Sequence, residues 1–208
     1  MTVNKYIFTS FPLWYSIILL FKNKLNFEHI LTLNSSIHAL ISSICSITYL
    51  YSYISLDTYK NTLGFSITYI LYDVINLIKK KDYQLLLHHI VMLISLSPLI
   101  SNKISSLILV NNYYVYISKF FLSEITTIFL NISWILYKIK KTNTKLFRIN
   151  TYILLVLTFL IRVCYVTYLN REIYLDNINN FLILTIPLTL LNYYWFYRLC
   201  IKALSFNS

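Results

Sequence analysis

Residues 62–100 read TLGFSITYILYDVINLIKKKDYQLLLHHIVMLISLSPLI, and this stretch indicates how the whole chain is built. Its two apolar runs, 62–78 and 84–100, are each about long enough to cross the hydrocarbon core of a bilayer as a helix. Only a short segment rich in lysine, 79–83, separates them. We therefore expect two antiparallel transmembrane helices that are joined at a basic turn and lie next to each other.

The composition extends this pattern to the rest of the chain. Hydrophobic residues make up 58% and charged residues 12% of the 208 residues, whereas a soluble domain is about half apolar and about a quarter charged. This composition excludes an ordinary soluble globule and a disordered chain. The single glycine also excludes dinucleotide fingerprints and phosphate loops, which need at least two glycines. The expected fold class is an all-α integral membrane protein with seven spans at 6–21, 33–54, 62–78, 84–100, 106–136, 149–169 and 181–197.

The first apolar run allows two alternatives. No small-residue cleavage site follows it, and Lys22 and Lys24 do, so we expect an uncleaved span rather than a signal peptide. If this run lies on the membrane surface, the chain has six spans instead of seven.

The basic residues predict the orientation of the chain. Of the 18 Lys and Arg residues, twelve fall in alternate loops and the C-terminal tail, four fall on the opposite side, and two fall within spans. Under the positive-inside rule, the C-terminus is cytosolic and the N-terminus lies on the far side. The net charge of +11 is therefore spread between apolar runs, and we expect no nucleic-acid partner.

Four ionisable residues within the expected spans lie at a common depth. Each such residue costs about 2.5 to 3.5 kcal/mol on insertion scales, so it needs a partner or a role. At a rise of ~1.5 Å per residue, all four lie ~6 to 8 Å below the cytosolic surface. An imidazole beside a carboxylate can act as a general base or nucleophile, and the candidate catalytic residues are His38, Asp73, His88 and His89.

Two other interpretations of these four residues stay open. A buried hydrogen-bonded cluster would order the packing of the helices without any chemistry. A metal site is disfavoured, because neighbouring histidines on a helix chelate poorly and no His pair has the i, i+4 spacing. We therefore expect no metal.

Glu124 and Arg162 lie deeper, ~18 to 20 Å from the cytosolic ends of their spans. Their matching height on successive antiparallel spans allows two interpretations. They form a structural ion pair inside the bundle, or they line a cavity that binds a lipid head group.

Four motifs resemble the TLC-domain family. They are GFSITYILYD at 64–73 followed by LLLHHIV at 85–91, NSSIHA at 34–39, LSEITTIFLNISW at 122–134, and FLIR at 159–162. The resemblance covers roughly 27–202. It implies an endomembrane protein, in the endoplasmic reticulum or a related compartment, with a six-helix core around a lipid-accessible cavity. On this basis 1–26 is an N-terminal span and loop, 27–202 is the TLC domain and 203–208 is a cytosolic tail.

The resemblance also implies a role in lipid metabolism. Relatives that are ceramide synthases transfer an acyl group from acyl-CoA to a sphingoid amine through paired histidines and nearby acids. Those enzymes carry an Asp-x-x-Asp element after the histidine pair, whereas 95–120 here contains no Asp or Glu. The chain therefore resembles the shorter TLC-domain proteins more closely.

Two functional hypotheses follow. One is an acyltransferase with acyl-CoA as co-substrate, membrane lipids as partners and no cofactor. The other is a non-enzymatic protein of lipid binding, lipid homeostasis or trafficking. A channel or transporter is disfavoured, because the chain has no glycine-rich broken helices.

Overall fold

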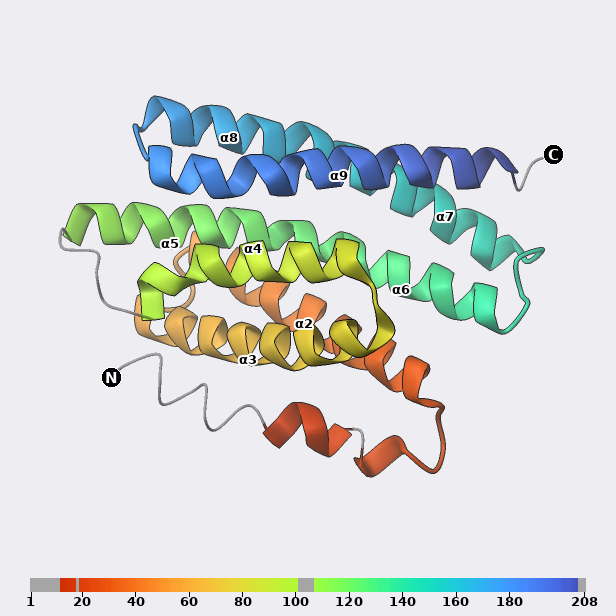
Figure 1. Ribbon diagram of the computed structural model, residues 1–208. Coiled ribbons are helices and arrows are strands. Elements are labelled where there is room, and N and C mark those ends of the chain that lie inside the picture. Colours follow the sequence, from red (N-terminus) through yellow and green to blue (C-terminus); the bar gives the residue numbers. More distant parts are fainter. Residues whose placement is uncertain (1–11, 18, 101–106, 206–208) are drawn as a thin grey trace. The chain divides into compact units, whose positions relative to one another are not determined.

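The computed structural model describes residues 12–17, 19–100 and 107–205, and every regular element within them is helical (Figure 1). A short apolar helix, Pro12–Phe21, comes first. The elements that follow are α2 (Phe27–Leu50), α3 (Leu56–Lys80), α4 (Tyr83–Ile100), α5 (Leu107–Phe121), the 3₁₀ helix η1 (Leu122–Glu124), α6 (Ile125–Lys138), α7 (Lys145–Leu157), the π-helix η2 (Thr158–Tyr165), α8 (Val166–Leu175) and α9 (Asn179–Ser205). The expected all-α class is confirmed.

Among the described residues, three helical segments are both long and apolar enough to cross a membrane: Phe27–Leu50, Asn112–Lys138 and Lys145–Leu175. The apolar part of α4, Tyr83–Ser97, is shorter. The spans expected at 62–78 and 181–197 lie within α3 and α9. Residues 6–11 and 18 of the first expected span and residue 106 of the fifth lie outside the described residues. The number of crossings stays a prediction.

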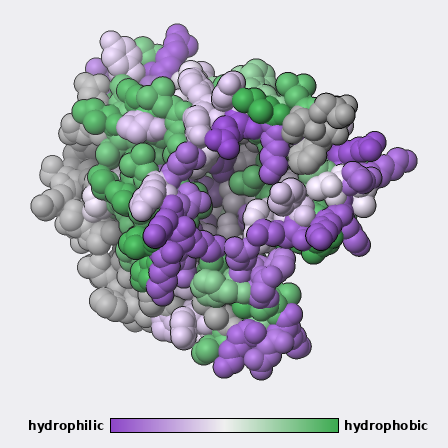
Figure 2. Space-filling view, turned by 45° about the vertical axis from the view of Figure 1, so that its right-hand side comes forward, coloured by the Kyte–Doolittle hydropathy of each residue, from purple (hydrophilic) through white to green (hydrophobic). Residues whose placement is uncertain are grey.

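Large hydrophobic side chains are exposed on helices from both halves of the chain. Figure 2 shows hydrophobic residues on the surface beside groups of hydrophilic ones. In a membrane, lipid tails surround the apolar side chains that long helices expose, so this surface fits an integral membrane protein. Representative residues are Leu40, Ile44, Ile75, Ile94, Leu130, Ile153, Leu160 and Leu190.

The chain divides into two compact units, Met1–Phe121 and Leu122–Ser208. In the first unit α2 packs against α3 and α5, and α3 packs against α4. In the second, α6 packs against α7, α8 packs against α9, and η2 contacts α7, α8 and α9. The span expected at 106–136 includes the 3₁₀ turn η1, at which the second unit begins.

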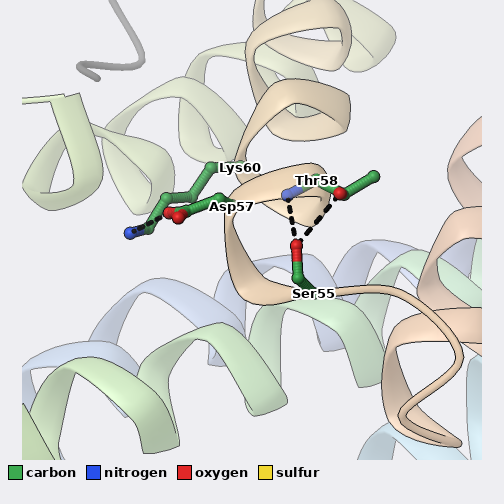
Figure 3. A network of polar contacts seen from close by, with 4 residues as sticks. All are labelled: Ser55, Asp57, Thr58 and Lys60. Atoms are coloured by element: carbon green, nitrogen blue, oxygen red, sulfur yellow. Dashed lines mark hydrogen bonds and ion pairs between the residues drawn. The ribbon is translucent and has the colours of Figure 1, made fainter.

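The start of α3 is fixed by local polar contacts (Figure 3). The Ser55 hydroxyl accepts a hydrogen bond from the Thr58 backbone N–H at 3.2 Å and lies 3.0 Å from the Thr58 hydroxyl. Asp57, in the first turn, favours the positive end of the helix dipole and pairs with Lys60 at 3.1 Å. Ser55 thereby caps the helix and defines where α3 begins.

A two-residue turn joins α3 to α4. Lys81 adopts the left-handed conformation with φ 58°, which ends α3. The Asp82 carboxylate then accepts a hydrogen bond from the Leu85 N–H at 3.2 Å and caps α4. Because the turn is so short, α3 and α4 run antiparallel and in contact. This confirms the hairpin predicted from the sequence.

Candidate functional site

Asp73 on α3 and His89 on α4 meet across this hairpin. Nδ1 of His89 lies 3.3 Å from Oδ2 of Asp73. Both residues are buried, with exposed fractions of 8% and 7%. The contact is close, but its angles fall outside those of a well-aligned hydrogen bond. Catalytic contacts are often loose without substrate and tighten when it binds.

His38 on α2 joins this pair through an aromatic side chain. Its ring stacks on the ring of Tyr69 with a centroid distance of 4.1 Å and an interplanar angle of 14°. The Tyr69 ring in turn meets His89 edge-on, at 6.2 Å. Nε2 of His38 is buried and has no hydrogen-bond partner among the described residues. Buried polar atoms are nearly always paired, so this nitrogen needs an explanation.

His88 lies beside the pair without entering it. Its ring centroid is 5.5 Å from that of His89, and the two rings are tilted by 41°. Adjacent residues on a helix point about 100° apart, so only His89 is directed at Asp73. The structure thus places His38, Asp73, His88 and His89 close together. It also distinguishes the two adjacent histidines, because His89 contacts Asp73 and His88 does not.

The sequence did not single out the aromatic wall of this cluster. Trp14 is fully buried, its ring centroid is 5.1 Å from that of Tyr69, and its Nε1 donates a hydrogen bond to Thr68 at 3.3 Å. Asn34 donates to the backbone carbonyl of Trp14 at 3.3 Å. One signal was present, because Tyr69 precedes Asp73 by four residues and therefore shares its helix face.

A second polar cluster surrounds Arg162 in the other unit. Nε of Arg162 donates to the Thr126 hydroxyl at 2.5 Å, and Nη2 donates to the Thr127 hydroxyl at 2.9 Å. Nη1 is 3.5 Å from the Asn192 side-chain oxygen, and the guanidinium lies 5.9 Å from the centre of the Trp195 ring. Arg162 belongs to the π-helix η2. Such wide helical turns are rare and often occur at functional sites.

Glu124 is linked to this cluster indirectly. The Thr127 hydroxyl donates to Oε2 of Glu124 at 3.0 Å and accepts from Arg162. Within the part of the chain that the structure describes, the two opposite charges form no direct ion pair. A direct ion pair of Glu124 and Arg162 was one of the two interpretations of the sequence. The structure instead connects the two side chains through the hydroxyl of Thr127. Because Arg162 already has several protein partners, the cluster is well suited to holding helices together.

The two clusters differ in what they can do. The Arg162 cluster is largely satisfied by its own side chains, whereas the histidine cluster leaves a buried nitrogen unpaired beside a carboxylate and a second imidazole. Across the described ranges, no three His, Cys, Asp or Glu side chains are grouped so that they could hold a metal ion. The histidine cluster therefore offers groups for proton transfer and hydrogen bonding.

These features define an all-helical integral membrane protein with a buried histidine and aspartate cluster in one unit. The chain belongs to the TLC-domain family, whose model matches residues 4–201. No match was found among curated proteins or among solved structures.

Proposed function

We propose that this TLC-domain protein acts on membrane lipids, and that the cluster of His38, Asp73, His88 and His89 carries out an acyl transfer. The observation that supports this most strongly is the buried, unpaired Nε2 of His38 beside the contact of Asp73 with His89. A cluster that only orders helix packing is expected to pair its buried polar atoms. A site that receives a substrate keeps such an atom free for it.

The proposed step uses His89 as the base. Asp73 lies against Nδ1 and thereby orients the ring, so Nε2 accepts a proton from the amine or hydroxyl of the acceptor lipid. The acceptor nitrogen or oxygen bonds to the thioester carbonyl carbon of acyl-CoA. The C–S bond then breaks, and the proton on His89 passes to the CoA thiolate. Nε2 of His38 is suited to hydrogen-bonding the carbonyl oxygen as its charge develops.

Positively charged loops on the cytosolic side would attract the phosphates of acyl-CoA, and the basic asymmetry of the loops supports a cytosolic C-terminus. The endoplasmic reticulum, or a related endomembrane, is the proposed compartment. Glu124 and Arg162 are proposed to help bind the lipid substrate.

The alternative is a lipid-binding, lipid-homeostasis or trafficking protein without catalysis. It is favoured by the lack of Asp and Glu in residues 95–120, where ceramide synthases carry acidic residues. This departure also supports closeness to the shorter TLC-domain proteins. In this case the same cluster would bind a head group and leave it unchanged.

Untargeted lipidomics distinguishes the two functions. Cells would express the wild type, a His88→Ala/His89→Ala double variant, a His29→Ala control or no protein, at matched levels of folded protein. His29, the only histidine outside the cluster, lies in the first turn of α2. Catalysis is supported if the amount of one lipid class increases in cells with the wild type and with the control, but not in cells with the double variant. Identical profiles in all four samples would refute it.

A further inference from the structure

A cavity of about 370 Å³ lies in the second unit, and its lining shares no residue with the histidine cluster or the Arg162 cluster. This volume lies within the size range of sites for small molecules. One face of α7, the last turns of α9 and two residues of the connection between α6 and α7 line it. The lining residues are Thr142, Asn143, Phe147, Arg148, Thr151, Tyr152, Leu155, Cys200, Ala203 and Leu204.

The lining changes character along α7. Arg148 lies near the start of the helix, beside the polar loop residues, and Leu155 lies seven residues further on. At ~1.5 Å per residue these two positions are ~10 Å apart along the helix axis. Arg148 precedes the span expected at 149–169 and Leu155 lies inside it. The cavity therefore has a cationic, polar end at the expected membrane boundary and an apolar end within the expected hydrocarbon region.

Arg148 is the cation in the lining of the cavity, and it has no partner among the residues that the structure describes. Its side chain is exposed and makes no hydrogen bond, ion pair or ring contact within the described residues. By contrast, Arg198 donates a hydrogen bond to Tyr194 at 3.0 Å, and Lys202 lies 4.7 Å from the centre of the Tyr137 ring. The Arg148 guanidinium is thus free to bind an anion from outside the chain.

A second polar group in the lining also lacks a partner. The hydroxyl of Thr151 is buried and makes no hydrogen bond among the described residues. Thr151 lies one turn beyond Arg148, so the two side chains share a face of α7. A ligand oxygen near Arg148 would also satisfy this hydroxyl.

The charge around the cavity selects an anionic ligand. No Asp or Glu occurs between Glu124 and Glu172 or after Asp176. The last residue of α6, the connection and the first turn of α7 carry only positive charges, at Lys138, Lys140, Lys141, Lys145 and Arg148. Basic residues near a membrane surface each favour anionic lipids by electrostatic attraction.

We infer that this cavity binds an anionic phospholipid, with its phosphate at Arg148 and Thr151 and the beginning of an acyl chain along Leu155. The polar and apolar ends of the cavity match the two parts of such a molecule. Arginine suits the phosphate, because its planar guanidinium donates two parallel hydrogen bonds. This site is independent of the proposed acyl transfer, whose catalytic residues lie in the other unit.

Cys200 provides a direct probe, because it lines the cavity. Cys45 and Cys164 are the other two cysteines, and all three are free thiols. The full chain carrying Cys45→Ser and Cys164→Ser would be placed in phosphatidylcholine vesicles, with or without phosphatidic acid. The measured quantity is the rate at which a maleimide modifies Cys200. A third arm adds soluble glycerol phosphate to vesicles of phosphatidylcholine alone.

We expect phosphatidic acid to slow modification about tenfold at roughly ten times its dissociation constant, whereas glycerol phosphate leaves the rate unchanged. Arg148→Gln should abolish this protection. Lys145→Gln, which removes the same charge one turn earlier and outside the lining, should retain it. Both side chains are exposed, so neither change should unfold the protein. An equal rate in both kinds of vesicle, protection by glycerol phosphate, or equal loss in both variants would overturn the inference.

Discussion

Nδ1 of His89 lies 3.3 Å from Oδ2 of Asp73, so a buried imidazole and a buried carboxylate face each other across the hairpin of α3 and α4. The two-residue turn after Lys80 sets the register of the hairpin and therefore this contact. A charged group in such a setting is costly unless it is paired. Substitutions of Asp73 and of the residues around it can therefore measure the effect of the pair on activity separately from its effect on stability.

Asp73→Asn should remove the activity and largely preserve the fold. The amide keeps the size of the carboxylate but loses the negative charge that orients His89 and stabilises its protonated form. We expect the rate of lipid product formation to fall by roughly 100-fold or more, with thermal unfolding close to that of the wild type. Asp57→Asn is the matched control, because Asp57 is exposed and its ion-pair partner is Lys60, which lies outside the histidine cluster. Equal activity in both variants would contradict a role for the Asp73 charge.

Tyr69 is predicted to position His38 through its ring. Tyr69→Phe keeps the ring that stacks on His38 at 4.1 Å, whereas Tyr69→Leu removes it. Aromatic pairs contribute about 1 kcal/mol beyond the area that they bury, so the Leu variant should be less stable than the Phe variant by at least this amount. Chemical denaturation in detergent measures the difference. Equal stability of the two variants would show that the stack contributes nothing.

Arg162→Met should destabilise the second unit by about 3 kcal/mol. The substitution removes the cation that Thr127 connects to the Glu124 carboxylate, and it removes the hydrogen bonds to Thr126 and Thr127. The free energy of unfolding in detergent is the measurement. Arg198→Met serves as control, because Arg198 is exposed and its contact with Tyr194 should contribute little. A neutral Arg162→Met would mean that the cluster does not hold the helices together.

Trp14 is predicted to anchor the N-terminal helix to the first unit. Trp14→Ala removes a fully buried ring and its hydrogen bond to Thr68, and replacing a core Trp by Ala costs about 3 to 5 kcal/mol. Tyr15→Ala is the neighbouring control, since Tyr15 has an exposed fraction of 57%. We expect a clear drop in the unfolding midpoint for the first variant only. Similar midpoints would indicate that this helix is not part of the core.

The sequence predicted the hairpin site well, because the length of the connection and the number of residues from its ends determine where the site lies. The short basic segment at 79–83 requires antiparallel neighbours, and counting residues from its ends places Asp73 and His89 at the same depth. Which of two adjacent histidines meets Asp73 depends on the rotation of α4 about its axis. Residue counting does not determine that rotation, so both His88 and His89 were candidates and only His89 makes the contact.

The sequence was less informative about the Arg162 cluster. Depth alone placed Glu124 and Arg162 at one level, but the side-chain directions were not predictable, and Thr127 lies between them. The 3₁₀ turn η1 and the π-helix η2 were also not predicted. Neither segment contains the Gly or Pro that usually signals a helix irregularity. Trp14 was overlooked because an aromatic residue in an apolar run looks the same whether it faces lipid or the core.

The most direct test of the proposed acyl transfer follows an acyl group into lipid. Cells that express the wild type, Asp73→Asn, His89→Ala or the His29→Ala control would be fed a deuterated fatty acid, and label would be measured in each lipid class at matched protein levels. The proposal predicts one class whose labelling rises with the wild type and with His29→Ala, and stays at the level of untransfected cells with Asp73→Asn and His89→Ala. Labelling that is the same with and without the wild-type protein, or that both cluster variants retain, would contradict it.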